Sequence, residues 1–173
     1  MAQIPKANGH RFSGLFQAAT PEVSPESRPR QDSLAYDLDA ALASIFALHA
    51  EVPEDAFTAQ TLGTERQGNG VLLDRDGLVL TIGYLVTEAT QVTLASVSGK
   101  VTHADVVGFD QETGFGLVRA HSIEDAQPIR RGSAIPLVTG ESLVVGGHGG
   151  RKHALATQLV SKREFAGYWE YLL

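Results

Sequence analysis

The 173-residue sequence contains no cysteine, which excludes disulfide bonds, a thiol nucleophile and a thiolate metal site. It is also short of positive charge, with 14 Lys and Arg residues against 20 Asp and Glu and a net charge of -6. Without a broad basic surface to neutralise phosphates, we expect neither nucleic acid nor an anionic membrane as a partner. The basic clusters Arg130–Arg131 and Lys162–Arg163 are predicted to be solvated surface.

Long apolar runs are missing as well. The first 30 residues contain no run of signal-peptide length, and no stretch approaches the roughly 20 apolar residues of a membrane span. We therefore expect a soluble protein, cytoplasmic as written and extracytoplasmic if the N-terminus is incomplete. At 173 residues, the chain has room for one domain with a sizeable core and part of a second.

The N-terminal part changes character near residue 33. Residues 1–32 hold four of the seven prolines and no sustained apolar period, which predicts a flexible tail. From Ser33 onward apolar residues recur at helical spacing, with Ser33 or Asp37 as N-cap, and a first strand is expected near residues 45–50. The polar stretch 58–67 is expected to be irregular.

Strand and turn signals dominate the middle of the chain. The apolar triplets 71–73 and 78–80 flank Asp74-Arg75-Asp76-Gly77, a short loop with glycine where a positive φ is needed, which predicts a hairpin. Further strands are predicted at 91–97 and 101–108, around the turn Ser98-Gly99-Lys100. Strands recurring this often, separated by glycine, favour an all-β closed or sandwiched fold over βαβ units.

Several segments carry a resemblance to a known family. Gly68-Asn69-Gly70, the apolar triplet, the Asp-Gly turn and Leu78-Val79-Leu80-Thr81 resemble the start of the trypsin-like barrel in the Deg/HtrA serine proteases. The block from Asp110 to Val118 resembles the turn after the fifth strand of that barrel, and residues 140–147 and 154–161 resemble the first strands of its second barrel. The resemblance covers roughly residues 43–162. It implies a trypsin-like six-stranded β-barrel with its leading helix over 33–132, and an incomplete second barrel over 133–173.

The same resemblance locates the catalytic positions. The family motif Thr-Asn-x-His-Val-Val falls on residues 81–86, so Tyr84 stands at the position of the general base. The aspartate that orients this histidine corresponds to Gly114, and no Gly-Asn-Ser-Gly-Gly nucleophile segment occurs in the sequence. A phenol with a pKa of about 10 is a poor base at neutral pH, and glycine has no side chain to orient one. We therefore predict no catalytic residues.

Other residues at these sites are given structural roles. Tyr84 is predicted to be a packed aromatic with a locally bonded hydroxyl, and Asp110 a turn residue that accepts backbone N–H bonds. His103 and His121, inside and just after predicted strands, are interpreted as structural histidines.

The remaining candidate site is the glycine-rich segment 146–153. Its histidines, His148 and His153, are weak candidates for a divalent metal site, because imidazole suits zinc, copper and nickel. The neighbouring Arg151 and Lys152 repel a cation, and a mobile β-turn is the favoured interpretation. The glycines do not match a phosphate-binding loop, and no cofactor is predicted.

The leading hypothesis is a catalytically inactive trypsin-like protein, a pseudoprotease or a fragment of one. It would bind a protein or peptide through an exposed strand edge, or self-associate there. One alternative is a serine endopeptidase whose nucleophile lies beyond residue 173. The other is divalent-metal binding at His148 and His153.

Overall fold

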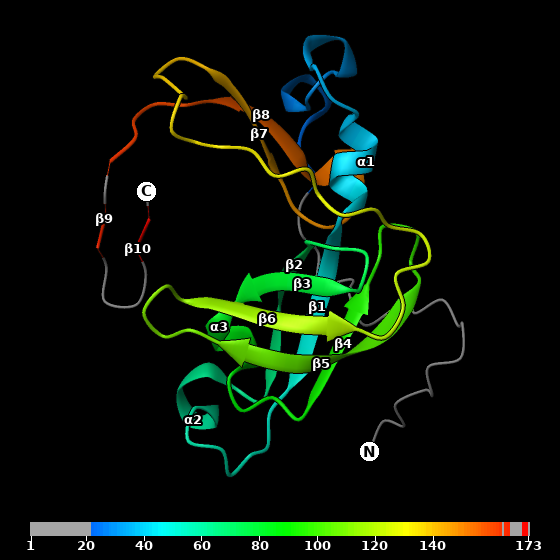
Figure 1. Ribbon diagram of the computed structural model, residues 1–173, viewed down its shortest axis with the longest axis vertical. Coiled ribbons are helices and arrows are strands. Elements are labelled where there is room, and N and C mark those ends of the chain that lie inside the picture. Colours follow the sequence, from blue (N-terminus) through cyan, green and yellow to red (C-terminus); the bar gives the residue numbers. More distant parts are fainter. Residues whose placement is uncertain (1–21, 164, 167–170, 173) are drawn as a thin grey trace.

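The computed structural model describes residues 22–163, 165–166 and 171–172. Six antiparallel strands close into a barrel with the spatial order β1-β2-β3-β6-β5-β4 (Figure 1). These strands are β1 (Ile45–Glu51), β2 (Glu65–Leu72), β3 (Leu78–Ile82), β4 (Gln91–Ala95), β5 (Val101–Phe109) and β6 (Phe115–Ala120). The predicted all-β, six-stranded barrel is confirmed.

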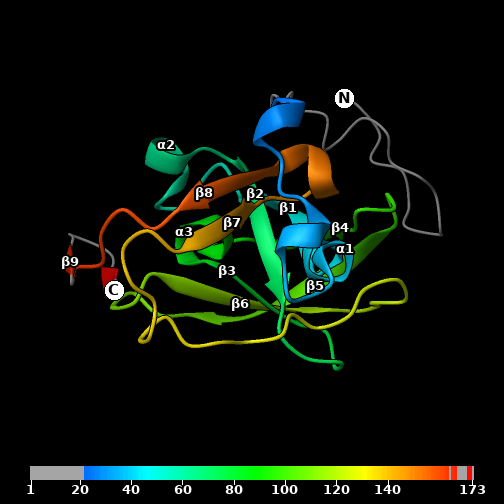
Figure 2. The same ribbon diagram turned by 90° about the horizontal axis from the view of Figure 1, so that it is seen from above.

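A second, smaller sheet follows the barrel. It consists of β7 (Ser142–Gly146) and β8 (Ala154–Gln158), which pair antiparallel and overlie the barrel when the molecule is viewed from above (Figure 2). The short strands β9 (Phe165–Ala166) and β10 (Tyr171–Leu172) pair with each other. The helices are α1 (Leu38–Ala43), α2 (Ala59–Leu62) and α3 (Gly83–Val86), and the 3-10 turns are η1 (Pro25–Ser27), η2 (Gln31–Ser33) and η3 (Gly150–His153). No helix within the described residues has the length and hydropathy needed to cross a membrane.

Helix α1 packs against both the barrel and the second sheet. Asp37 caps it, since its Oδ1 accepts a 3.1 Å bond from the amide of Ala40, one of the two caps expected. Leu38 and Leu42 are buried and form a small core with Ile45 of β1 and Ala154 of β8. This apolar contact holds β7 and β8 against the barrel.

The segment before α1 lies against η3. The amide of Val23 donates a 2.8 Å bond to the carbonyl of Lys152, and the Lys152 ammonium pairs with Glu22 at 3.0 Å. Glu22 and Val23, part of the predicted tail, therefore make specific contacts with a residue more than a hundred positions away. The rest of that tail, residues 1–21, lies outside the described residues.

The predicted hairpin is confirmed as β2–β3. Asp74 Oδ1 accepts 2.9 Å bonds from the amides of Asp76 and Leu78, and Gly77 has a φ of 83°, where a side chain would be strained. Inside the barrel, Phe46, Leu48, Leu72, Val79, Leu94 and Val118 are almost fully buried. Each side chain of this kind contributes about 1.5–3 kcal/mol through burial.

The expectation of irregular structure over residues 58–67 is wrong. Helix α2 begins at Ala59, and β2 already begins at Glu65, because Glu65 pairs with Glu51 at the end of β1. Pairing with a neighbouring strand supplies the backbone hydrogen bonds here, although the side chains are polar and carry no strand signal.

Candidate functional site

The candidate site is a corner between the end of β3 and the turn 110–114 that joins β5 to β6. The amide of Gly83 donates a 2.7 Å hydrogen bond to the carbonyl of Gly114. A Cβ at position 83 would lie 3.2 Å from that carbonyl oxygen and 3.4 Å from Phe109 Cβ, so glycine permits the close approach. Tyr84, the next residue, therefore lies beside Gly114. Because the family resemblance predicts the catalytic histidine and aspartate positions at Tyr84 and Gly114, we call Gly83, Tyr84 and Gly114 the catalytic frame.

The Tyr84 side chain is 52% exposed, so the prediction of a packed aromatic is wrong. The cause is the single turn of α3, in which Gly83, Leu85 and Val86 are buried. Leu85 and Val86 fill the barrel end, and Tyr84 is left on the solvent side. The phenol ring of Tyr84 therefore does not fill space in the barrel core.

The other half of the frame is the turn 110–114. Asp110 accepts bonds from the amides of Glu112 at 3.1 Å and Thr113 at 3.3 Å, and from the Thr113 hydroxyl at 2.7 Å. The Thr113 hydroxyl and these amides lower the pKa of Asp110. Its predicted role as a turn residue is confirmed. Gly114 closes the turn with a φ of 75°, and no side chain extends from it toward Tyr84.

Sequence reasoning missed the residue that holds α3 in place. Arg66 of β2 is buried, and its Nη1 donates to the carbonyls of Tyr84 at 2.6 Å and Thr87 at 2.9 Å. Its Nη2 donates to the Thr58 hydroxyl at 2.7 Å. Burial lowers the pKa of Arg66, and the carboxylate of Glu88 opposes that shift. An isolated arginine in a polar stretch gave no signal of this role.

Glu88, which lies just after α3, bonds to the same Thr58 that Arg66 contacts. Its carboxylate accepts bonds from the amides of Phe57 at 3.0 Å and Thr58 at 2.8 Å, and from the Thr58 hydroxyl. These bonds from Thr58 are the main reason that the pKa of Glu88 is lowered. Glu88 has a φ of 60°, an unusual value for a residue with a side chain. Arg66 and Glu88 together join α2, β2 and α3.

His103 and His121 lie away from the frame. They sit at the opposite end of the β5–β6 pair from Gly114, where the amide of His121 donates to the carbonyl of His103. Six residues of β-strand span roughly 20 Å, so neither imidazole reaches Tyr84. His121 Nε2 instead contacts Asp105 Oδ2 at 2.9 Å on the exposed surface. Both histidines have the structural placement that the sequence predicted.

The histidines of the glycine-rich segment face each other. The rings of His148 and His153 stack at 6.4 Å with an interplanar angle of 17°. Asn69 Oδ1 accepts from both the backbone amide of His148 at 3.0 Å and its Nδ1 at 2.9 Å, so this ring nitrogen carries the proton. Burial and the charge of His153 lower the pKa of His148. Within the described part of the chain, no group of three or more potential metal ligands includes this pair.

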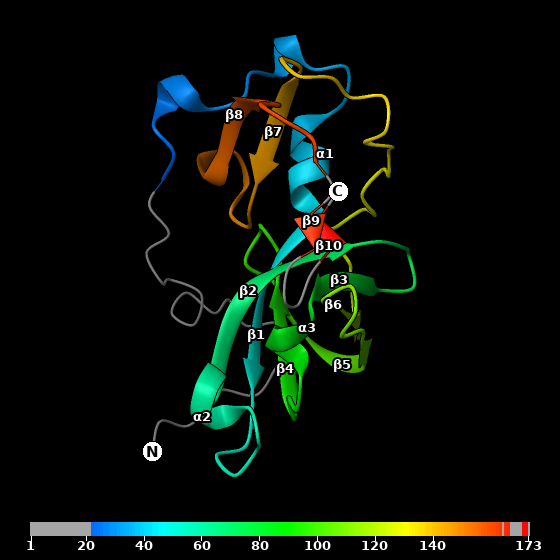
Figure 3. The same cartoon turned by 90° about the vertical axis from the view of Figure 1, so that its left-hand side faces the viewer.

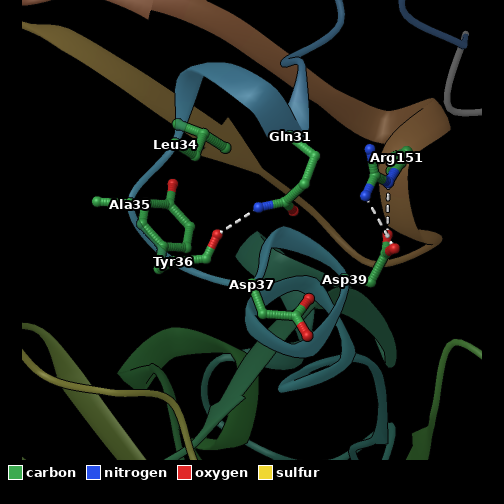
Figure 4. Close-up of a pocket in the computed structure, with 7 residues that line it drawn as sticks. All are labelled: Gln31, Leu34, Ala35, Tyr36, Asp37, Asp39 and Arg151. Carbon is green, nitrogen blue, oxygen red and sulfur yellow. Dashed lines mark hydrogen bonds and ion pairs between the residues drawn. The ribbon is translucent and has the colours of Figure 1, made fainter.

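A pocket of about 480 Å³ lies near the start of α1 (Figure 4). Its polar groups are paired with one another or with the backbone: Gln31 Nε2 donates to the carbonyl of Tyr36 at 2.7 Å, and Arg151 makes two bonds to the carboxylate of Asp39. These partners leave few groups free to recognise a ligand.

The six-stranded barrel agrees with a comparison to known families. Residues 68–171 match the family described as trypsin-like peptidase domain, which is more than half of the chain. The chain belongs to the trypsin-like peptidase domain family. The matched range begins in β2 and includes both Tyr84 and Gly114.

Individual relatives of this trypsin-like domain are longer proteins. It is 26% identical over 120 residues to Protease Do-like 1, chloroplastic, of Arabidopsis thaliana, a match that covers 68% of this chain and 27% of the relative. Among solved structures it resembles the HtrA-type protease AlgW with tripeptide, with a TM-score of 0.57, 17% identity, and coverage of 72% of this chain and 38% of that one.

It also resembles an inactive form of Rv3671c from M. tuberculosis, with a TM-score of 0.55, 22% identity, and coverage of 74% and 58%. These structural matches show the shared fold. The chain thus spans about a quarter of the curated relative and between 38% and 58% of these solved chains.

Proposed function

We propose that this trypsin-like domain is catalytically inactive and acts as a protein- or peptide-binding module. The observation that carries the proposal is the catalytic frame, in which Tyr84 is exposed and Gly114 has no side chain. Serine proteases need an imidazole to take the serine proton and a carboxylate to orient that imidazole. In subtilisin, loss of the histidine alone lowers kcat by about 2 × 10⁶.

The binding role is supported by the second sheet. Within the described residues, β7 and β8 pair only with each other, so each strand has one unpaired edge. The cross-strand pair Val145 and Leu155 is exposed on one face. A peptide that adds a strand to such an edge gains backbone hydrogen bonds and covers apolar side chains. The similar HtrA-type protease AlgW is known with a tripeptide.

Self-association at the same edge would also satisfy those backbone groups. Size-exclusion chromatography with light scattering separates the two cases, because a peptide-binding monomer keeps the 18.4 kDa mass of the chain. Lysine substitutions at Val145 and Leu155 are expected to abolish a dimer held through this edge.

The inactivity is tested with fluorescein-labelled casein and the whole chain, with trypsin as the positive control. We expect hydrolysis no faster than in buffer. Casein cleavage that a serine-directed inhibitor abolishes would overturn the proposal.

A serine endopeptidase is the second candidate function. It is favoured by the family and by the partial coverage of the relatives. On this hypothesis the nucleophile lies beyond residue 173, and sequencing the gene past that codon decides whether a Gly-x-Ser-Gly segment follows. Tyr84 would still occupy the position of the base.

A further inference from the structure

A groove separate from the catalytic frame lies beside α1. It has a volume of about 670 Å³ and is formed by α1, the linker 127–132 and β7, with α1 lying between β7 and the linker in Figure 3. Ala41, Ile129 and Val144 form a partly exposed apolar floor over the buried side chains of Leu38, Leu42 and Ile45, and most of the lining is apolar. The volume falls within the range of about 300–1,000 Å³ typical of ligand sites.

One rim of the groove carries unpaired positive charge. Arg130 and Arg131 line it and are exposed, and within the part of the chain that the structure describes they make no ion pair or hydrogen bond. Among the described residues that line the groove, Asp37 is the only acidic one, and its carboxylate caps α1. The lining is therefore net positive on a chain whose net charge is -6. An anionic group is the complementary ligand.

The linker also has free backbone groups beside the apolar floor. The amide of Ile129 donates a 2.9 Å bond to the carbonyl of Leu72, which anchors the linker to the barrel. Over the next residues, 130–132, no backbone hydrogen bond is made to any described residue. An extended peptide can pair with such a segment while its side chains enter the groove.

We propose that this groove binds an extended peptide segment of a partner protein, with aliphatic side chains next to an aspartate or glutamate. The aliphatic side chains cover the floor, and the carboxylate pairs with Arg130 and Arg131, whose guanidinium groups suit a carboxylate. The proposal rests on the binding role proposed above and assigns it to a surface other than the β7–β8 edge.

The test begins with a phage-displayed library of random heptapeptides selected on the immobilised whole chain. We expect enriched sequences to combine aliphatic residues with Asp or Glu. A fluorescein-labelled peptide of the enriched sequence is then titrated by anisotropy. Arg130→Gln and Arg131→Gln are each expected to weaken its binding about tenfold or more, the effect of losing a hydrogen bond to a charged group.

Two further variants locate the binding surface. Ala40→Trp places a large ring at the groove wall and should abolish binding, whereas Arg75→Gln removes an exposed charge from the β2–β3 loop and should leave the affinity unchanged. Circular dichroism checks that each variant folds.

Three outcomes overturn the groove proposal. Peptide binding that is lost in Val145→Lys or Leu155→Lys but not in the arginine variants would assign binding to the β7–β8 edge and leave the proposed function standing. A dimer in light scattering that Arg130→Gln dissociates would make a second copy the occupant. No enrichment of any peptide would remove the peptide-binding role as well, while the casein assay still decides catalysis separately.

Discussion

The amide of Gly83 and the carbonyl oxygen of Gly114 are joined by a 2.7 Å hydrogen bond across the end of the barrel. This bond holds α3 against the β5–β6 turn and places Tyr84, the residue after Gly83, near Gly114. The family resemblance predicts that these two positions correspond to the catalytic histidine and aspartate. The two backbone segments are thus in contact, and the residues at the two positions are a tyrosine and a glycine.

Gly114→Asp, which introduces a carboxylate at this position, is expected to lower the free energy of unfolding by about 1–2 kcal/mol. The reason is the φ of 75° at Gly114, where a side chain is strained. Urea denaturation measures the change. Gly108→Ala is the matched control, because nothing lies within 4 Å of a Cβ built there and the residue has no positive φ. Equal stability of the two variants would contradict the argument.

Tyr84→His is expected to change stability by less than about 0.5 kcal/mol, because the side chain is 52% exposed. The variant should also gain no activity on labelled casein, since the aspartate position still holds Gly114. Thermal unfolding and the casein assay provide the two measurements. A destabilisation comparable to that of Leu85→Ala, a matched change at the buried neighbour, would show that the phenol is packed after all.

Arg66→Leu is expected to destabilise the protein by about 2–4 kcal/mol. The substitution leaves the carbonyls of Tyr84 and Thr87 without their donor in a partly buried place. Urea denaturation gives the loss, and hydrogen exchange should show faster exchange over residues 83–88 than elsewhere in the barrel. Arg75→Leu, at an exposed arginine of the β2–β3 loop, is the control and should be nearly neutral.

The lowered pKa of His148 predicts that the stability of the fold depends on pH near neutrality. Burial and the charge of His153 hold its pKa in the folded state below the usual value of about 6.5, so the unfolded chain binds protons more readily. The stability from this group is therefore fully present above pH 6.5 and is lost as pH falls through the folded-state pKa. His153→Gln removes the neighbouring charge and should raise the His148 pKa in an NMR titration. An unchanged titration would show that the ring stacking has no electrostatic effect.

A second loss of stability is expected at more acidic pH. The pKa values of Glu88 and Asp110 are lowered by hydrogen bonds to Thr58 and Thr113, so their contribution is lost only as pH falls below about 4. Unfolding measured between pH 8 and pH 3 should therefore show two separate declines. Glu88→Gln should reduce the acidic decline and leave the one near neutrality.

Much of the barrel was predictable because its signals are local. The Asp74–Gly77 loop, the apolar triplets on either side of it and the Asp37 cap each depend on residues a few positions apart. The bonds of Asp110 to the amides that follow it belong to the same class. By contrast, the exposure of Tyr84 was predicted wrongly, because the direction of a side chain on a single helical turn depends on which neighbours fill the barrel.

By itself, the sequence determined the all-β class, the hairpins and the absence of thiol chemistry, and it predicted that histidine and aspartate are missing from the frame. Only the tertiary structure decided that Arg66 clamps α3, that Asn69 holds His148, and that Arg130 and Arg131 border an apolar groove. The contact between Asn69 and His148, for example, joins residues 79 positions apart. The physical reason is that turns and caps are stabilised by near neighbours in the chain, whereas clamps and grooves exist only once the barrel closes and brings distant residues together.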